Sequence, residues 1–237
     1  MNRRMAWATA AVLLIAAALW PVTTRYGINY RWSSRRITLF EKAVHFISRD
    51  LQTRRLVAEL TRGVERGEPT LIRLFEWTVA NVHSTPEGFP VVDDHPLHIL
   101  LRGYGAEDQR TEAFALLASY AGFPATAVTL RVPGRDAGLI VAAVRAGPRT
   151  LIFDVNHGVI FRNEAGRLAD LVELSRNPLA VRRAAGNLMV GGVPYARFFE
   201  GVDRQIPTFE RMEGQKPWPR LRQEVTHLFA RPLETSR

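Results

Sequence analysis

Residues 102–122 read Arg102-Gly103-Tyr104-Gly105-Ala106-Glu107-Asp108-Gln109-Arg110-Thr111-Glu112-Ala113-Phe114-Ala115-Leu116-Leu117-Ala118-Ser119-Tyr120-Ala121-Gly122. Gly103 and Gly105 permit backbone angles that other residues resist, and they predict a turn. Behind them, apolar residues recur at steps of three and four, which is the period of one buried helical face. Asp108 suits a helix start, where free N–H groups and the positive end of the dipole favour carboxylates. The pattern predicts a buried helix with Glu107 at or just before its first turn.

This run resembles the core of the transglutaminase-like family, within the papain-like thiol enzymes. That family opens its core helix with Gly-x-Gly-x-Cys-Asp, continues with a strand that carries His, and follows with a strand that ends in Asp. Residues 103–110 match the run, with Glu107 where the cysteine is expected. The resemblance covers about residues 71–171. It implies an α+β fold with a papain/transglutaminase-like core, in which a helical N-terminal part precedes a core helix packed on an antiparallel sheet.

The same resemblance implies that the catalytic triad is degenerate. Leu139 takes the position of the base His, and Asp154 takes that of the triad Asp. Asp154 also has a structural interpretation, as a strand-end carboxylate that accepts hydrogen bonds from turn N–H groups. His157 could reach the same cleft or lie at the surface. The candidates for lining the cleft are Tyr104, Glu107, Asp108, Gln109, Asp154 and His157.

The net charge of +9 is concentrated near the N-terminus. Six arginines and no acidic residue precede Ile37, whereas the remaining 201 residues carry 26 basic and 23 acidic groups. Because these arginines flank a hydrophobic run, they favour a membrane surface over a nucleic-acid partner. Cysteine is absent, which excludes a disulfide framework and a thiol nucleophile.

Residues 5–22 contain no charged side chain and are rich in Ala, Leu, Val and Ile. The run is near the short limit of a bilayer-spanning helix. Trp20, Arg25 and Tyr26 look like interface residues and favour an uncleaved transmembrane anchor, while Ala16-Ala17-Ala18 leaves a cleaved signal peptide as the alternative. We expect a bacterial-type inner-membrane protein with a single pass and its domain on the exported side.

The spacing of the apolar residues changes along the rest of the chain, from a helical period before Gly122 to strand-like runs after it. Leu71, Ile72, Phe75, Val79 and Val82 predict a helix with one apolar face, after earlier helical stripes between residues 40 and 64. Beyond Gly122, the pattern predicts strands at 125–132, 138–146 and 149–154 joined by short turns, and a fourth strand at 159–161. Helix candidates in the C-terminal part lie at residues 171–174, 179–185, 194–202 and 221–229.

We therefore expect a membrane segment at 1–24, a basic linker at 25–36, a transglutaminase-like domain at 37–175 and a C-terminal helical extension at 176–237. His95 and His98 lie beside two aspartates, but their spacing is a weak metal signal, and we expect neither a metal site nor a cofactor.

The expected function is that of a membrane-anchored, catalytically degenerate transglutaminase-like protein. Such a pseudoenzyme acts as a binding or scaffold module, with an envelope protein, a peptide or a glycan as partner and without nucleic acid. By analogy with related domains, the setting is cell-envelope or polysaccharide assembly. The alternative is a hydrolase or peptidase that uses the carboxylates of Glu107 and Asp154, with His157 in the same cleft.

Overall fold

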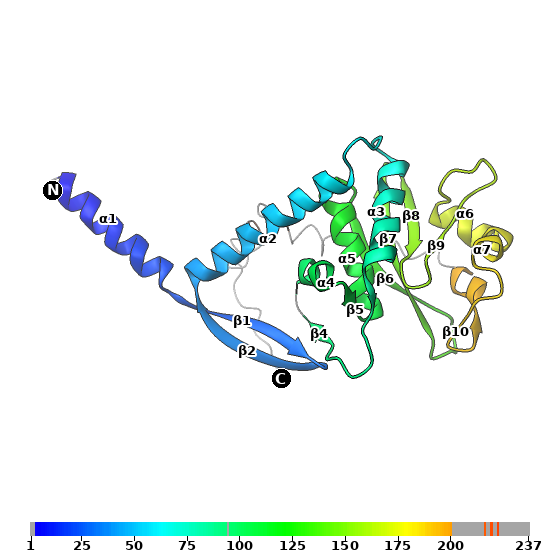
Figure 1. The fold of residues 1–237 in the computed structure, drawn as a ribbon, viewed down its shortest axis with the longest axis horizontal. Coiled ribbons are helices and arrows are strands. Elements are labelled where there is room, and N and C mark those ends of the chain that lie inside the picture. Colours follow the sequence, from blue (N-terminus) through cyan, green and yellow to red (C-terminus); the bar gives the residue numbers. More distant parts are fainter. Residues whose placement is uncertain (1–2, 94, 201–215, 217–218, 220–221, 223–237) are drawn as a thin grey trace, which may run out of the picture.

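The computed structural model describes residues 3–93 and 95–200, together with residues 216, 219 and 222, as a mixed α/β fold. Figure 1 shows a body of packed helices and strands from which an elongated N-terminal part extends. We call residues 3–51 the N-terminal arm. It comprises α1 (Arg3–Ala18), β1 (Pro21–Ile28), β2 (Arg31–Thr38) and the first half of α2 (Leu39–Leu60). The body comprises α3 (Glu68–Asn81), β3 (His83–Ser84), β4 (Val92–Asp93), α4 (Pro96–Arg102), β5 (Tyr104–Gly105), α5 (Glu107–Tyr120), β6 (Ala125–Arg131), β7 (Gly138–Ala146), β8 (Arg149–Asp154), β9 (Val159–Ile160), α6 (Leu171–Arg176), α7 (Pro178–Ala185), β10 (Met189–Val190), β11 (Val193–Pro194) and the 3₁₀ helix η1 (Tyr195–Phe199).

The expected N-terminal transmembrane helix is wrong, and with it the expected single-pass inner-membrane localisation. α1 has 16 residues and ends at Ala18, instead of continuing to Val22. The chain enters β1 at Pro21, because a proline followed by β-branched residues favours extended backbone over helix. Within the described ranges, no helix is both long enough and apolar enough to cross a bilayer.

The segment 25–36, expected as a basic linker, instead lies within a β-hairpin. β1 pairs with β2 in antiparallel register from Pro21↔Thr38 to Ile28↔Arg31, and the short strand β4 joins the other edge of β1. Asn29 and Tyr30 form the two-residue turn with positive φ angles of 46° and 62°. Thr38 then begins α2 through a reciprocal capping box with Glu41. The hairpin thus holds the start of α2 beside the end of α1.

The sheet order β6-β7-β8-β9 is antiparallel throughout. The predicted strands at 138–146 and 149–154 are confirmed residue for residue, and the first strand ends one residue earlier than predicted, at Arg131. Alternate side chains of these strands are buried on opposite faces, as the pleat requires. The sheet is therefore covered on both sides.

One face of the sheet packs against α5. Ala142, Val144, Leu151 and Phe153 share a buried cluster with α3, α4 and α5, in which the rings of Phe75, Phe114 and Phe153 lie 5.0–5.9 Å apart. The other face packs against the C-terminal segment. There Leu139, Val141, Ala143 and Ile152 join the buried rings of Phe161, Tyr195, Phe198 and Phe199.

The C-terminal segment begins with α6 and α7, which confirm the helix candidates at 171–174 and 179–185 with slightly wider bounds. The candidate at 194–202 contains the 3₁₀ helix Tyr195–Phe199, whose buried aromatic side chains belong to the cluster on this sheet face. Residues 201 and 202 of that candidate lie outside the described residues. The candidate at 221–229 lies outside the described residues, except for Arg222. α7 and η1 contribute to the second core cluster, and the expected domain limits at 37–175 and 176–237 stay a prediction.

Candidate functional site

The glycine turn positions the start of α5 by two different means. Gly103 ends α4 in the left-handed region, with φ 74°, where a residue with a side chain is strained. Gly105 has no such angle, but an added Cβ would lie 3.0 Å from Ile99 and 3.1 Å from Gln109. The turn therefore needs one glycine for its backbone angle and one for close packing.

α5 begins at Glu107, as the sequence pattern predicts. Glu107 and Asp108 are exposed in its first turn, and the Gln109 side chain accepts a hydrogen bond from the Ala106 N–H. Carboxylates at this end of a helix are stabilised by the free N–H groups and the dipole. Glu107 therefore stands at a helix start, which is the place that the resemblance assigns to a nucleophile.

Asn156 connects the start of α5 to the turn that follows β8. Its Nδ2 donates to the carbonyl oxygen of Glu107 at 3.2 Å, to Thr111 Oγ1 at 3.2 Å and to the carbonyl oxygen of Ile140 at 3.3 Å. The core helix, the strand β7 and the β8–β9 turn consequently meet at one point. The start of α5 therefore lies beside the turn that follows Asp154.

Asp154 is fully buried at the end of β8. Its Oδ1 accepts hydrogen bonds from the backbone N–H groups of Asn156 at 3.0 Å and His157 at 3.1 Å. Its Oδ2 lies 2.8 Å from His157 Nδ1 and accepts a hydrogen bond from the Tyr195 hydroxyl at 2.7 Å. The predicted structural role, a strand-end carboxylate bonding turn N–H groups, is confirmed. We call Asp154, Asn156, His157 and Tyr195 the Asp154 cluster.

The two side chains bound to Asp154 Oδ2 differ in exposure. The His157 side chain is 27% exposed, so one edge of the imidazole reaches solvent while Nδ1 faces the carboxylate. Tyr195 is 1% exposed, and burial, followed by the neighbouring Asp154, raises the pKa of its phenol. Tyr195 thus reaches the cluster as a neutral donor.

Sequence reasoning missed Tyr195. It lies 41 residues beyond Asp154, in a segment without a recognisable motif. Only the docking of η1 on the sheet brings its hydroxyl to the carboxylate.

Arg110 adds a buried cation next to this cluster. Its Nε donates to the carbonyl oxygen of Val82 at 3.0 Å, and its terminal nitrogens donate to Ser84 Oγ and to the carbonyl oxygen of Val155. Burial lowers the pKa of the guanidinium, an effect that the charges of Asp154 and Glu107 oppose. The Arg110 guanidinium therefore lies within electrostatic reach of both carboxylates at the junction of α5 and β8.

Leu139 is not brought to Glu107. Its side chain is 1% exposed within the cluster on the sheet face opposite α5. Tyr104 and Gln109 also have other partners. The Tyr104 ring packs edge-on against Phe89, and Gln109 Nε2 donates to the carbonyl oxygen of Val92 in β4.

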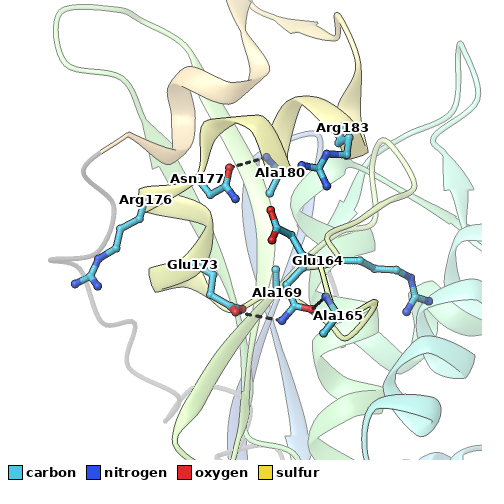
Figure 2. Close-up of a pocket in the computed structure, with 10 residues that line it drawn as sticks. Glu164, Ala165, Ala169, Glu173, Arg176, Asn177, Ala180 and Arg183 are labelled. Atoms are coloured by element: carbon cyan, nitrogen blue, oxygen red, sulfur yellow. Dashed lines mark hydrogen bonds between the residues drawn. The ribbon is translucent and has the colours of Figure 1, made fainter.

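Two cavities among the described residues lie away from the Asp154 cluster. One of about 440 Å³ lies between the β9–α6 loop and the helices α6 and α7, where Figure 2 shows acidic and basic side chains around the hollow. Asn177 there caps α7 through the Ala180 N–H. The other, of about 560 Å³, lies on the hairpin and is lined by Tyr26, Ile28, Asn29, Arg31 and Ser33.

His95 caps α4 by accepting the Leu97 N–H on Nδ1, which agrees with a polar lead-in to that helix. Asp94, one of the two neighbouring aspartates, lies outside the described residues. Among the described residues, no group of three or more His, Asp or Glu side chains could hold a metal ion.

Comparison of the chain with protein-family models, with curated proteins and with solved structures gives no match. The resemblance of residues 103–110 to the transglutaminase-like family therefore stays a prediction.

Proposed function

We propose that this chain is a catalytically degenerate transglutaminase-like protein that acts as a binding or scaffold module. The observation that carries the proposal is the junction of α5 and β8. An exposed glutamate opens the core helix there, and a buried aspartate ends the strand beside it. The setting in cell-envelope or polysaccharide assembly, with a peptide, a glycan or a partner protein as ligand, rests on the resemblance alone.

The chemistry of the junction argues against a thiol-type catalytic triad. A thiol-type triad needs a nucleophile, a base within hydrogen-bond reach and a group that orients the base. The chain has no cysteine, and the position of the base is a buried leucine, Leu139. Asp154 is already engaged by two backbone N–H groups, an imidazole and a phenol. The carboxylate therefore fixes a turn and docks η1.

A cysteine placed at position 107 tests whether α5 begins at a former nucleophile position. Since the chain has no cysteine, Glu107→Cys introduces a single thiol. A helix N-terminus lowers the pKa of a thiol, so Cys at 107 is expected to react with iodoacetamide at pH ~6–7 faster than an ordinary thiol does. Glu164→Cys is the matched control, because Glu164 is exposed in a loop. Equal alkylation rates in the two variants would contradict the proposal.

A measurement of enzymatic turnover is the second test of the proposal. The purified protein is expected neither to hydrolyse nor to cross-link a panel of peptide substrates. If it does so, and Glu107→Ala abolishes that turnover, the binding-module proposal is overturned.

One observation favours the hydrolase alternative. The contact between His157 Nδ1 and Asp154 Oδ2 holds the imidazole against a carboxylate, which is the geometry of a His–Asp acid–base dyad. In that case Glu107→Gln and His157→Gln would each abolish turnover, whereas Asp108→Asn, a matched change one residue away, would leave it intact. Turnover that survives either of the first two variants would exclude this alternative.

A further inference from the structure

The N-terminal arm holds most of the apolar surface that the described residues leave in water. Of 22 large hydrophobic residues that are exposed, 17 lie between residues 5 and 51. In α1 they cover every side of the helix, which has no buried residue. In α2 they include Phe40, Val44, Ile47 and Leu51. Monomeric proteins rarely leave contiguous apolar patches of this extent without a partner.

The arm is also the basic part of the molecule. Residues 3–51 carry eight basic and two acidic side chains, a net of +6. Of the two acids, Asp50 is buried and bound to Arg54 and to the Tyr120 hydroxyl, and Glu41 is used in the cap of α2. The six arginines that precede Ile37 are all exposed. The exposed surface of the N-terminal arm therefore combines positive charge with apolar side chains.

The hairpin turn presents an aromatic residue at a conformational cost. Tyr30 has φ 62° and is 79% exposed. Two-residue turns with two positive φ angles favour Asn-Gly, so a glycine would suit this position better than tyrosine. Trp32 and Tyr26 are exposed nearby on β2 and β1. A strained, exposed aromatic that the fold does not bury is an observation that points to a binding role.

We propose that the N-terminal arm binds the surface of an anionic lipid bilayer. Arginines would meet the phosphate headgroups, while Tyr30, Trp32 and the apolar side chains of α1 and α2 would enter the interfacial region. This is contact with one face of the bilayer, and it does not depend on the function proposed for the Asp154 cluster. The commitment to lipid rests on charge complementarity combined with the apolar surface.

Each of the other possible binding partners would suit only the charged part or only the apolar part of the N-terminal arm. A nucleic acid would neutralise the hairpin arginines but would leave Val12, Leu13 and Ile15 of α1 in water. A second copy of the chain could cover those side chains, but it would bring two arms of net charge +6 together. An anionic lipid surface satisfies both requirements.

Vesicle flotation with the full chain tests the proposal. The probes are phosphatidylcholine vesicles and phosphatidylcholine vesicles containing about one third phosphatidylglycerol, at ~0.05 M and ~0.15 M salt. The chain is expected to float only with the anionic vesicles and to bind them more weakly at the higher salt. Equal flotation with both kinds of vesicle, or with neither, overturns the proposal.

Charge variants locate the contact. The triple variant Arg31→Gln/Arg35→Gln/Arg36→Gln is expected to weaken anionic-vesicle binding roughly a hundredfold, at about fivefold per arginine near the surface. The control is Arg176→Gln/Arg182→Gln/Arg183→Gln, which removes equal charge from exposed positions of the body. An equal loss in the control overturns the assignment to the arm.

The variant Tyr30→Gly removes the aromatic while favouring the turn, so the hairpin is expected to stay intact. It should weaken binding a few-fold, and unchanged urea midpoints in all variants exclude unfolding as the cause. Two further outcomes would overturn the proposal in favour of another occupant. One is tight binding to duplex DNA without vesicle binding, and the other is concentration-dependent dimerisation without vesicle binding.

Discussion

Replacing Tyr195 with phenylalanine removes one hydrogen bond from the buried carboxylate of Asp154 and leaves the aromatic packing of η1 in place. The lost bond is 2.7 Å long and ends on a fully buried oxygen. A hydrogen bond to a charged group contributes about 1.5–3 kcal/mol to stability. Two backbone N–H groups and the imidazole of His157 still contact the carboxylate in the variant. We therefore expect a loss of about 2 kcal/mol in the free energy of unfolding.

The assay is urea unfolding followed by fluorescence, with a thermal scan as a second measure. For a domain of this size, a loss of about 2 kcal/mol lowers Tm by roughly 4–8 °C, and the m-value should stay constant. Tyr26→Phe is the matched control, because Tyr26 is exposed on the hairpin, and it should change stability by less than about 0.5 kcal/mol. If Tyr195→Phe is as mild as the control, Asp154 does not hold η1 through this bond.

The same variant has a signature at alkaline pH. The unfolded chain loses the tyrosine proton near pH 10, whereas burial and Asp154 raise the pKa in the folded chain. Folding therefore retains a proton above pH 10, and the stability contributed by this group falls as the pH rises. Tyr195→Phe should reduce that slope by about 1.4 kcal/mol per pH unit. An unchanged slope would show that Tyr195 titrates normally.

Three further outcomes follow from the described contacts. Phe153→Ala should lower the free energy of unfolding by about 3–5 kcal/mol, because its fully buried ring packs on two others; Phe153→Leu should cost clearly less in the same urea assay. Glu68→Gln should flatten the loss of stability on acidification below pH 4.5. Burial would raise the pKa of Glu68, but hydrogen bonds from Arg149 and the Leu168 N–H outweigh it and lower the pKa, so this stability is present above pH 4.5 and lost below. An acid titration of unfolding that is identical in both proteins would contradict this. Tyr120→Phe should also reduce the alkaline slope above pH 10, since burial and Asp50 raise the pKa of Tyr120; an unchanged slope would argue against that bond.

The elements that the sequence predicts correctly are those whose signal is local. The helix α5 begins at Glu107 because glycines, carboxylates and a period of three to four residues all act within one turn or two. β7 and β8 follow from β-branched runs bounded by turn residues. The bonds from the N–H groups of Asn156 and His157 to Asp154 also span only two and three residues. Such features depend on residues that are close in sequence, so a local pattern can predict them.

The predicted transmembrane helix is wrong because apolar content alone does not determine where a helix ends, and the backbone preference of the residues after Ala18 also counts. Residues 5–22 are uncharged, but Pro21 and the β-branched residues after it pair with β2, so the helix ends at Ala18. The register of that hairpin is set by the partner strand. The composition of residues 5–22 does not reveal the pairing with β2, which runs from Ile28↔Arg31 to Pro21↔Thr38.

The sequence by itself determined the turn, the core helix, the antiparallel strands and the identity of the residue at position 107. Only the tertiary structure decided that Asn156 reaches Glu107 across 49 residues and that Tyr195 reaches Asp154 across 41. It also placed Leu139 in the packing of the far sheet face. The reason is that a buried carboxylate accepts whichever donors the packing of distant segments brings within about 3 Å, and no local pattern encodes that choice.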